Sequence, residues 1–214
     1  MATDQQIIVR GEAEREAPAD VAALSVVVQV DAADQAGAYQ RATELSASVD
    51  DVLEQRASAL GPRQAAVVVV QPTTRWVDGE EQRTGWRAVR STSLDVTALD
   101  ELSPLLAELV AAGAIVHGPA WRLRPEHPVA AEVRAAAAVD ARNRATSYAE
   151  ALGVRVGRVD WIVEPGLRAV ALGGQMGSAP GRLMATAAES GEMAVAPATL
   201  TVMASVEVAF AIER

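Results

Sequence analysis

The stretch AVDARNRATSYAEALGVRVGRV, residues 138–159, gathers an acid, an amide and two bases at Asp140, Asn143, Arg142 and Arg144. A carboxylate beside guanidinium groups is suited to binding a polar ligand. On a helix, however, Asp140 and Arg144 would form an i,i+4 ion pair worth a few tenths of a kcal/mol. The spacing favours this second interpretation, in which the cluster is the solvated flank of a helix. In the alternative, Asp140 lies against a sheet and orders Arg144 or a backbone group at a strand end.

Other residues with catalytic potential are sparse. The two histidines, His117 and His127, are ten residues apart without a known metal-ligand spacing, and cysteine is absent, so we predict no metal site. The absence of lysine excludes a Schiff-base amine and the lysine of a phosphate loop. No Gly-x-Ser-x-Gly motif occurs, and GGQMGSAPG (173–181) lacks the strand–helix junction of a phosphate cradle. We therefore expect no catalytic residues and no cofactor.

The tryptophan and methionine residues suggest protein binding rather than catalysis. Trp76, Trp86 and Trp121 lie at expected strand ends or near a turn, where they either pack on a core or form an exposed interaction surface. Residues 165–197 are rich in Gly, Ala, Ser and Met and include Met176 and Met184. We interpret this stretch as a long loop. Such a loop is unusual in a compact domain, which favours contact with another subunit or a pocket beneath it.

Composition limits the partners and the compartment. The 214 residues are 50% hydrophobic but 3% aromatic, so the core must be built from Val, Ala and Leu. A net charge of -9 argues against nucleic acid. No segment approaches the ~18 to 20 apolar residues of a membrane span. The start MATDQQIIVRGEAERE has neither a basic region nor an apolar one, so we expect no signal peptide and a cytoplasmic location.

Periodicity predicts strands at 7–16, 21–30, 64–77, 86–97, 114–124, 156–164 and 198–212, and helices at 34–60, 99–112 and up to Leu152 before Gly153. The first two strands should form a hairpin across APAD (17–20), and the run AAVVVV (65–70) suggests burial on both faces. The order ββαββαβαββ predicts an α+β fold: largely antiparallel sheets packed with two long helices and one short helix. We expect a single domain over residues 1–214.

Four patches of the chain resemble the SIMPL-domain family, bacterial proteins also described as 26 kDa periplasmic immunogenic or oxidative-stress-defence-like proteins. They are IIVRGEAEREAPADVAAL (7–24), QPTTRW with GWRAVRSTSLDV (71–76 and 85–96), residues 138–159, and PATLTVMASVEVAFAI (197–212). Within them, the positions that match the family pattern are Gly11, Pro18, Asp20, Asp140, Arg144, Gly153 and Gly157. Ala19 separates Pro18 from Asp20, and Trp stands at 76 and 86 where Tyr is usual.

The resemblance implies a SIMPL-type fold and specifies structure better than function. It implies no established enzymatic activity, and it links members to stress defence and the cell envelope. We therefore expect a non-enzymatic interaction or assembly protein, self-associating and with a stress-related role, whose partners are copies of itself or an unidentified protein. The alternative is an enzyme or small-ligand binder with a pocket under the 165–197 loop.

Overall fold

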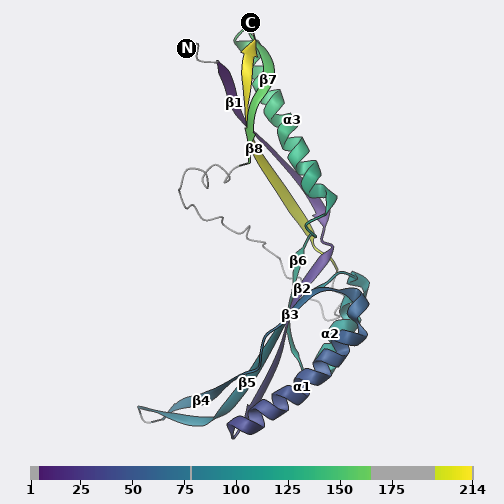
Figure 1. Cartoon of the computed structure of the whole chain (residues 1–214), viewed down its shortest axis with the longest axis vertical. Coiled ribbons are helices and arrows are strands. Elements are labelled where there is room, and N and C mark those ends of the chain that lie inside the picture. Colours follow the sequence, from purple (N-terminus) through teal and green to yellow (C-terminus); the bar gives the residue numbers. More distant parts are fainter. Residues whose placement is uncertain (1–4, 78, 165–195, 214) are drawn as a thin grey trace. The chain divides into compact units, whose positions relative to one another are not determined.

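The computed structural model describes residues 5–77, 79–164 and 196–213 (Figure 1). The chain forms two compact units. Unit 1 comprises residues 1–17, 125–188 and 199–214, and unit 2 comprises residues 18–124 and 189–198. Each unit draws on segments that are far apart in the sequence. The single domain expected over residues 1–214 stays a prediction, and the two units are described separately below.

Unit 2 is built on an antiparallel sheet. Its strands are β2 (Val21–Ala32), β3 (Leu60–Ala65), β4 (Val69–Val77), β5 (Glu80–Val96) and β6 (Ile115–Arg122). The order is β3-β5-β2-β6, and β4 pairs with the other part of β5. The β2–β5 ladder runs from Ala22 opposite Val96 to Ala32 opposite Trp86. Beyond Trp86, therefore, β5 keeps β4 as its neighbour but loses β2.

Two helices pack on one face of this sheet. They are α1 (Gln35–Gln55), followed by a short 3-10 turn (Ala57–Ala59), and α2 (Leu102–Ala111), preceded by another (Leu99–Glu101). Asp34 is the N-cap of α1, where its carboxylate accepts a hydrogen bond of 2.8 Å from the Gly37 N–H. The helix ends at Gln55 rather than at Leu60, because the chain turns through the 3-10 segment into β3.

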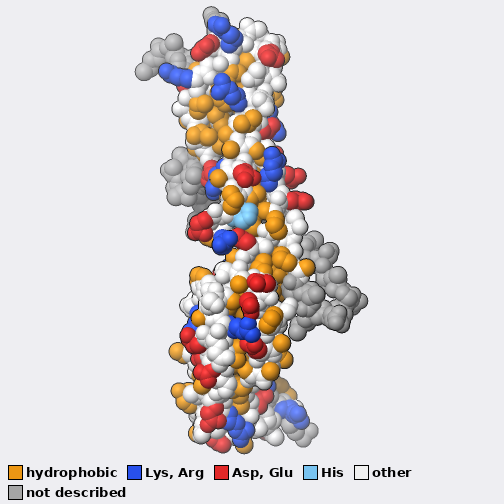
Figure 2. All heavy atoms as spheres, turned by 90° about the vertical axis from the view of Figure 1, so that its right-hand side faces the viewer, with side chains coloured by type: hydrophobic (Ala, Val, Ile, Leu, Met, Phe, Trp, Pro, Cys, Tyr) orange, Lys and Arg blue, Asp and Glu red, His pale blue; other side chains and the backbone are white. Residues whose placement is uncertain are grey.

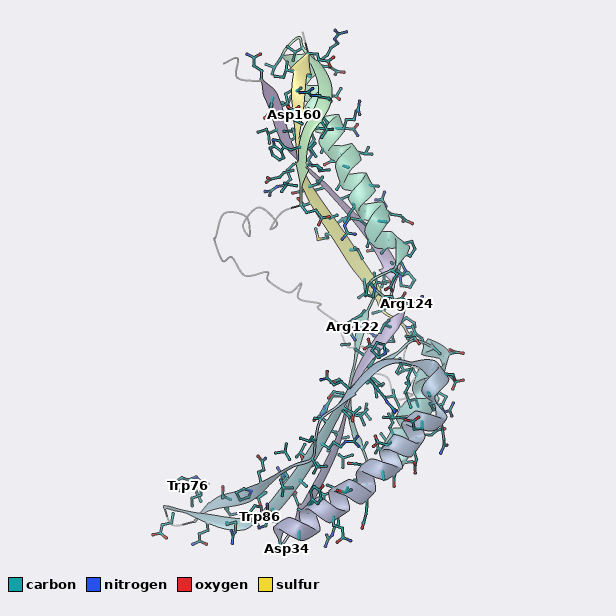
Figure 3. The ribbon with its side chains drawn as sticks, in the orientation of Figure 1. Asp34, Trp76, Trp86, Arg122, Arg124 and Asp160 are labelled. Atoms are coloured by element: carbon teal, nitrogen blue, oxygen red, sulfur yellow. The ribbon has the colours of Figure 1, made fainter. Side chains whose placement is uncertain are left out.

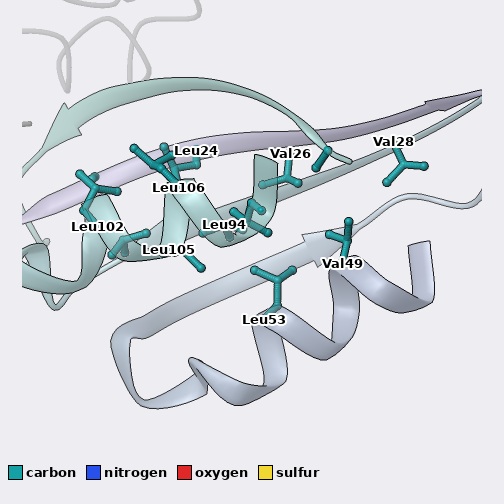
Figure 4. Close-up of a cluster of buried hydrophobic side chains, with 13 residues drawn as sticks. Leu24, Val26, Val28, Val49, Leu53, Leu94, Leu102, Leu105 and Leu106 are labelled. Carbon is teal, nitrogen blue, oxygen red and sulfur yellow. The ribbon is translucent and has the colours of Figure 1, made fainter. Parts of the chain in front are cut away.

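The core of unit 2 lies between the helices and the even-numbered residues of β2 (Figure 4). Leu53 of α1, Leu94 of β5 and Leu105 of α2 meet there and are fully buried. Trp121 packs at its margin as a partly buried residue. This cluster is built of Val, Ala and Leu, as the composition predicts, and close packing of such small side chains supplies its stability.

Unit 1 is a three-stranded sheet under one long helix. Its elements are β1 (Gln6–Pro18), α3 (Pro128–Ala151), β7 (Arg155–Val163) and β8 (Thr199–Glu213). The strand order is β1-β8-β7, and α3 packs mainly across β8. Four alanines of α3 are buried against Val206, Val208 and Phe210 of β8. They are Ala137, Ala141, Ala145 and Ala149.

The predicted fold class is confirmed: the protein is α+β, with antiparallel sheets, two long helices and one short helix among the described residues. The order has one strand more than expected, because the predicted strand 64–77 is two strands, β3 and β4. The predicted burial of the run 65–70 is wrong, since Val67 is 79% exposed and Val69 55% exposed. Both strands pair only with β5, so this run lies on the edge of the sheet.

The predicted hairpin of the first two strands is also wrong. β1 pairs with β8 in unit 1, whereas β2 pairs with β5 and β6 in unit 2. A turn sequence between two strands does not show which partners they choose, and here the partners come from the distant end of the chain. The strands β4 and β5 do form a hairpin, and it is tight, since Val77 already pairs with Glu80.

Candidate interaction surfaces

The end of the β4–β5 hairpin is a two-stranded ribbon, which we define as residues 73–77 and 80–85. It begins where β2 ends, and in Figure 3 Trp76 lies on it beyond Trp86. The Trp76 side chain is 71% exposed. A two-stranded ribbon is marginally stable by itself in water. The ribbon therefore presents a large aromatic side chain on a pair of strands that no other described strand covers.

The root of the ribbon is fixed by polar and aromatic contacts. Arg87 of β5 binds Asp31 of β2 through two hydrogen bonds, of 2.7 and 3.0 Å. The hydrogen bonds from Arg87 lower the pKa of the Asp31 carboxyl below its ordinary value. The Arg83 guanidinium lies 5.4 Å from the centroid of the Trp86 ring. These contacts hold the ribbon in a defined direction.

The other proposed surface residues differ from Trp76. Trp86 is half-buried against Ala38, Ala42 and Ala88, and Trp121 packs on the core of unit 2. Both therefore serve the core, at least in part, and Trp76 is the most exposed of the three. Met176 and Met184 lie outside the described residues, as does all of the 165–197 loop except its last two residues, so the pocket expected under it cannot be placed.

The polar cluster of residues 138–159 makes a structural contact inside unit 1. The Asp140 carboxylate accepts a hydrogen bond of 2.9 Å from the Glu12 N–H and forms an ion pair of 2.8 Å with Arg144 Nε. Asp140 thus forms the expected i,i+4 pair and also lies against β1, where it binds a backbone group in the middle of the strand and not at its end. Because β1 is an edge strand, the carboxylate occupies a backbone donor that would otherwise face solvent.

Gly11 explains why α3 can approach β1 so closely. A Cβ atom at Gly11 would lie 2.0 Å from the Ala137 carbonyl oxygen and 2.5 Å from the Ala141 nitrogen. No side chain fits in this space, and the small alanines of α3 complete the contact. The first and third patches of the family resemblance therefore meet in space, where they fix the helix on the strand.

We expect Asp140→Ala to destabilise the protein by about 1–2 kcal/mol, because it leaves the Glu12 N–H and Arg144 without their acceptor. Asp140→Asn keeps an acceptor oxygen and should cost less, and Arg144→Ala less still, since it spares the bond to β1. Urea denaturation gives the free energies, and hydrogen exchange at the Glu12 amide should speed up in the alanine variant alone. Equal exchange in all three variants would contradict this role.

The remaining signature residues are also structural. Asp20, which follows Pro18 at the end of β1, accepts hydrogen bonds from the Arg124 N–H at 2.8 Å and from Arg124 Nε at 2.9 Å. Gly153 adopts a φ of +69° just after α3, where glycine is the favoured helix terminator. Gly157 lies at an irregularity of β7, where a Cβ atom would meet the Ala211 carbonyl oxygen of β8 at 3.0 Å.

The two histidines lie in different settings, one at a helix end and one in a groove. His127 is the N-cap of α3 and accepts a hydrogen bond of 3.3 Å from the Val129 N–H. His117 lines a groove of about 830 Å³ on the sheet of unit 2, where Arg122 is ion-paired with Asp95. The described residues contain no cluster of three or more His, Cys, Asp or Glu residues able to hold a metal ion.

A second cleft of unit 2, of about 520 Å³, contains charges that the sequence interpretation missed. Arg56, at the end of α1, binds both Glu101 and Glu108, which belong to the α2 region. Its hydrogen bond lowers the pKa of the Glu108 carboxyl below the ordinary value. Arg56 precedes Glu101 by 45 residues and Glu108 by 52, so only the packing of the two helices reveals this network. It joins the end of α1 to the α2 region through one guanidinium shared by two carboxylates.

The described surface carries charges of both signs. In Figure 2, acidic and basic side chains are interspersed over the visible faces of the units. None of the described helices combines the length and the apolar character needed to cross a bilayer.

The fold and these contacts define the class of protein. It is an α+β protein in which the signature residues Gly11, Asp20 and Asp140 make structural contacts. A family model described as SIMPL, protein of unknown function (DUF541), matches residues 7–210. The chain therefore belongs to the SIMPL family, as the sequence resemblance implied.

Three curated relatives match half of the chain. They are described as uncharacterized protein YggE and come from Escherichia coli (strain K12), Escherichia coli O157:H7 and Shigella flexneri. Each is 34% identical over 107 residues, which are 50% of this chain and 44% of the relative. The match thus spans less than half the length of these relatives.

Proposed function

We propose that the protein is a non-enzymatic interaction module that associates with copies of itself through the β4–β5 ribbon. The observation that carries the proposal is Trp76, which is 71% exposed on a ribbon that has no third strand among the described residues. Exposed tryptophan is typical of interface centres, because it buries much apolar area on binding. Contact with a second ribbon would supply the missing cover.

The charges of the ribbon favour a second copy as its partner. Arg75 and Arg83 lie on the same ribbon as Glu80 and Glu81, and all four side chains are exposed. A surface that carries both signs can pair with itself about a two-fold axis, where each base meets the acid of the other copy. The contact would then combine a desolvated aromatic centre with a charged rim.

Light scattering during size-exclusion chromatography tests the proposal. We expect the parent protein to have at least the mass of a dimer and Trp76→Ser to have a lower mass, with about a tenfold weaker association as for an interface centre. Tyr148→Ser is the matched control, because Tyr148 is 60% exposed on α3 and belongs to unit 1, whereas the ribbon belongs to unit 2. If the parent is monomeric at high concentration, or if both variants associate like the parent, the proposal fails.

The family resemblance adds a stress-related role to this proposal, and a cytoplasmic location is proposed with it. Growth of a deletion strain under peroxide tests the role, and cell fractionation tests the location. Unchanged growth would remove the stress role and leave the assembly proposal in place, because light scattering decides that separately.

A further inference from the structure

The two strands at the centre and edge of the unit 1 sheet differ in length. β8 has 15 residues and β7 has 9, and their pairing ends at Val163 opposite Glu207. The first part of β8, residues 199–206, therefore has β1 on one side and no described strand on the other (Figure 1). We call this unpaired edge of residues 199–206 the β8 edge.

Two hydrogen bonds, one at each end of the β1–β8 pairing, show which backbone groups the β8 edge presents. The Ile212 N–H donates to the Gln5 carbonyl at 3.0 Å, and the Ala19 N–H donates to the Ala198 carbonyl at 2.9 Å. The even-numbered residues of β8 thus direct their backbone N–H and C=O groups toward β1. Because backbone groups alternate along a strand, the odd-numbered residues, among them Met203 and Ser205, present their N–H and C=O groups on the β8 edge.

A groove runs beside this edge, under α3. It has a volume of about 390 Å³ and a mostly apolar lining from α3, the end of β7 and β8. Ala137 and Ala138 form its α3 side, so that small side chains leave the space open, and the ion pair of Arg134 with Glu164 lies at its margin. The β8 edge therefore offers backbone hydrogen-bonding groups to an added strand, and the groove offers an apolar cover for one face of that strand.

We propose that the β8 edge binds an extended peptide segment of another protein, which adds to the sheet as a strand beside β8 and in line with β7. Unpaired N–H and C=O groups at regular spacing can be satisfied together by another extended backbone, which a helix or a small apolar molecule does not offer. The alanines of α3 limit the side chains that enter the groove to small apolar ones at every second position. On the opposite face, where Met203 is 75% exposed, polar side chains are accommodated.

Two further observations support an external strand. Pro165 follows Glu164 directly in the sequence and has no N–H, so it cannot donate to a ladder that continues β7. The hydroxyl of Ser205, which belongs to the β8 edge, is buried and has no hydrogen-bond partner among the described residues. Buried hydroxyls are usually paired, so an additional polar partner is expected near this strand. This binding site lies in unit 1 and is independent of the ribbon proposed for self-association.

A labelled synthetic peptide of alternating valine and threonine, blocked at both ends and carrying two terminal arginines for solubility, is a suitable probe. We expect saturable binding to the full chain by fluorescence anisotropy, and no binding of the same peptide with alternate nitrogens methylated. Met203→Pro removes one edge N–H without removing a hydrogen bond to β1, and should weaken binding about tenfold. Met203→Ala keeps the N–H and should bind within about twofold of the parent.

Circular dichroism and the urea midpoint show whether the proline variant is folded. If it is not, Ala138→Trp replaces it, because this change fills the groove from α3 and leaves the ladder untouched, and it should also weaken binding.

Equal binding by the parent and a folded blocking variant would overturn the proposal, as would failure of the parent to bind the peptide. Slow hydrogen exchange at Met203 and Ser205 in the peptide-free monomer would overturn it too, because the edge would then already be paired. If the parent dimerises and Met203→Pro separates it, the partner is a second copy and the peptide proposal is wrong.

Discussion

Replacing Gly11 by alanine should destabilise unit 1 by about 3 kcal/mol or more, among the largest effects of any single methyl group in this chain. The added Cβ would lie 2.0 Å from the Ala137 carbonyl oxygen, 2.5 Å from the Ala141 nitrogen and 2.7 Å from the Ala141 Cβ. The first two atoms belong to the backbone of α3, which cannot turn aside as a side chain can. The helix must therefore move away from β1, and the hydrogen bond from Glu12 to Asp140 must lengthen.

Urea denaturation measures the loss, and two further variants make it specific. Gly37→Ala is the control, because Gly37 lies in the first turn of α1 and its new Cβ would meet the nearest atom, Asp34 Oδ2, at 3.3 Å. We expect that variant to stay within about 1 kcal/mol of the parent. Adding Ala141→Gly to the Gly11→Ala variant should not restore stability, since the backbone contacts remain. A full rescue would show that the side chain of Ala141, and not the helix backbone, sets the approach.

Leu105→Ala should destabilise unit 2 by about 2–5 kcal/mol. Leu105 is fully buried in α2 and belongs to the cluster that contains Leu53 and Leu94 (Figure 4). Removing its branched end leaves a cavity that the neighbouring strands and helices cannot fill without losing their own contacts. Val110→Ala on the same helix is the control, because Val110 is 57% exposed, and it should change stability by less than about 0.5 kcal/mol.

The two substitutions together test how the chain unfolds. The buried clusters of units 1 and 2 share no residue, so we expect Gly11→Ala to lower the transition of unit 1 and Leu105→Ala that of unit 2. Calorimetry, with tryptophan fluorescence as a second probe, separates the transitions. One transition shifted equally by both substitutions would contradict this expectation and would support the single domain over residues 1–214 that the sequence suggests.

Local chemistry made several features predictable. Asp34 caps α1, Gly113 and Gly153 follow α2 and α3 with positive φ, and alternate apolar residues of β8 face the core. Each depends on a few neighbouring residues, whose effects on the backbone are known. The same reasoning overestimates helix burial. Helical spacing places Tyr148 and Leu152 on the face of the buried alanines, but they are 60% and 69% exposed. The helix α3 buries mainly alanines.

The candidate surfaces were less predictable, because they depend on which strands pair. Trp76 was identified as an interaction residue from its type, but nothing in the sequence separated it from Trp121, which packs on a core. One signal for the β8 edge was available. The predicted strands 156–164 and 198–212 differ by six residues, so the longer one had to leave part of an edge unpaired by the shorter. The groove beside that edge follows only from the alanines of a helix that packs across it.

The sequence by itself determined the α+β class, the SIMPL resemblance, the helix caps and the small-residue core, because these follow from local backbone preferences and composition. Tertiary structure alone decided that β1 pairs with β8 and not with β2, that the valine run 65–70 lies on an edge, and that Asp140 reaches the backbone of Glu12. These outcomes depend on contacts between residues far apart in the sequence, such as the Arg10–Glu207 ion pair, whose residues are 197 positions apart. Local propensity does not encode such contacts, since many pairings satisfy the same strand pattern and the packing of the whole chain selects one of them.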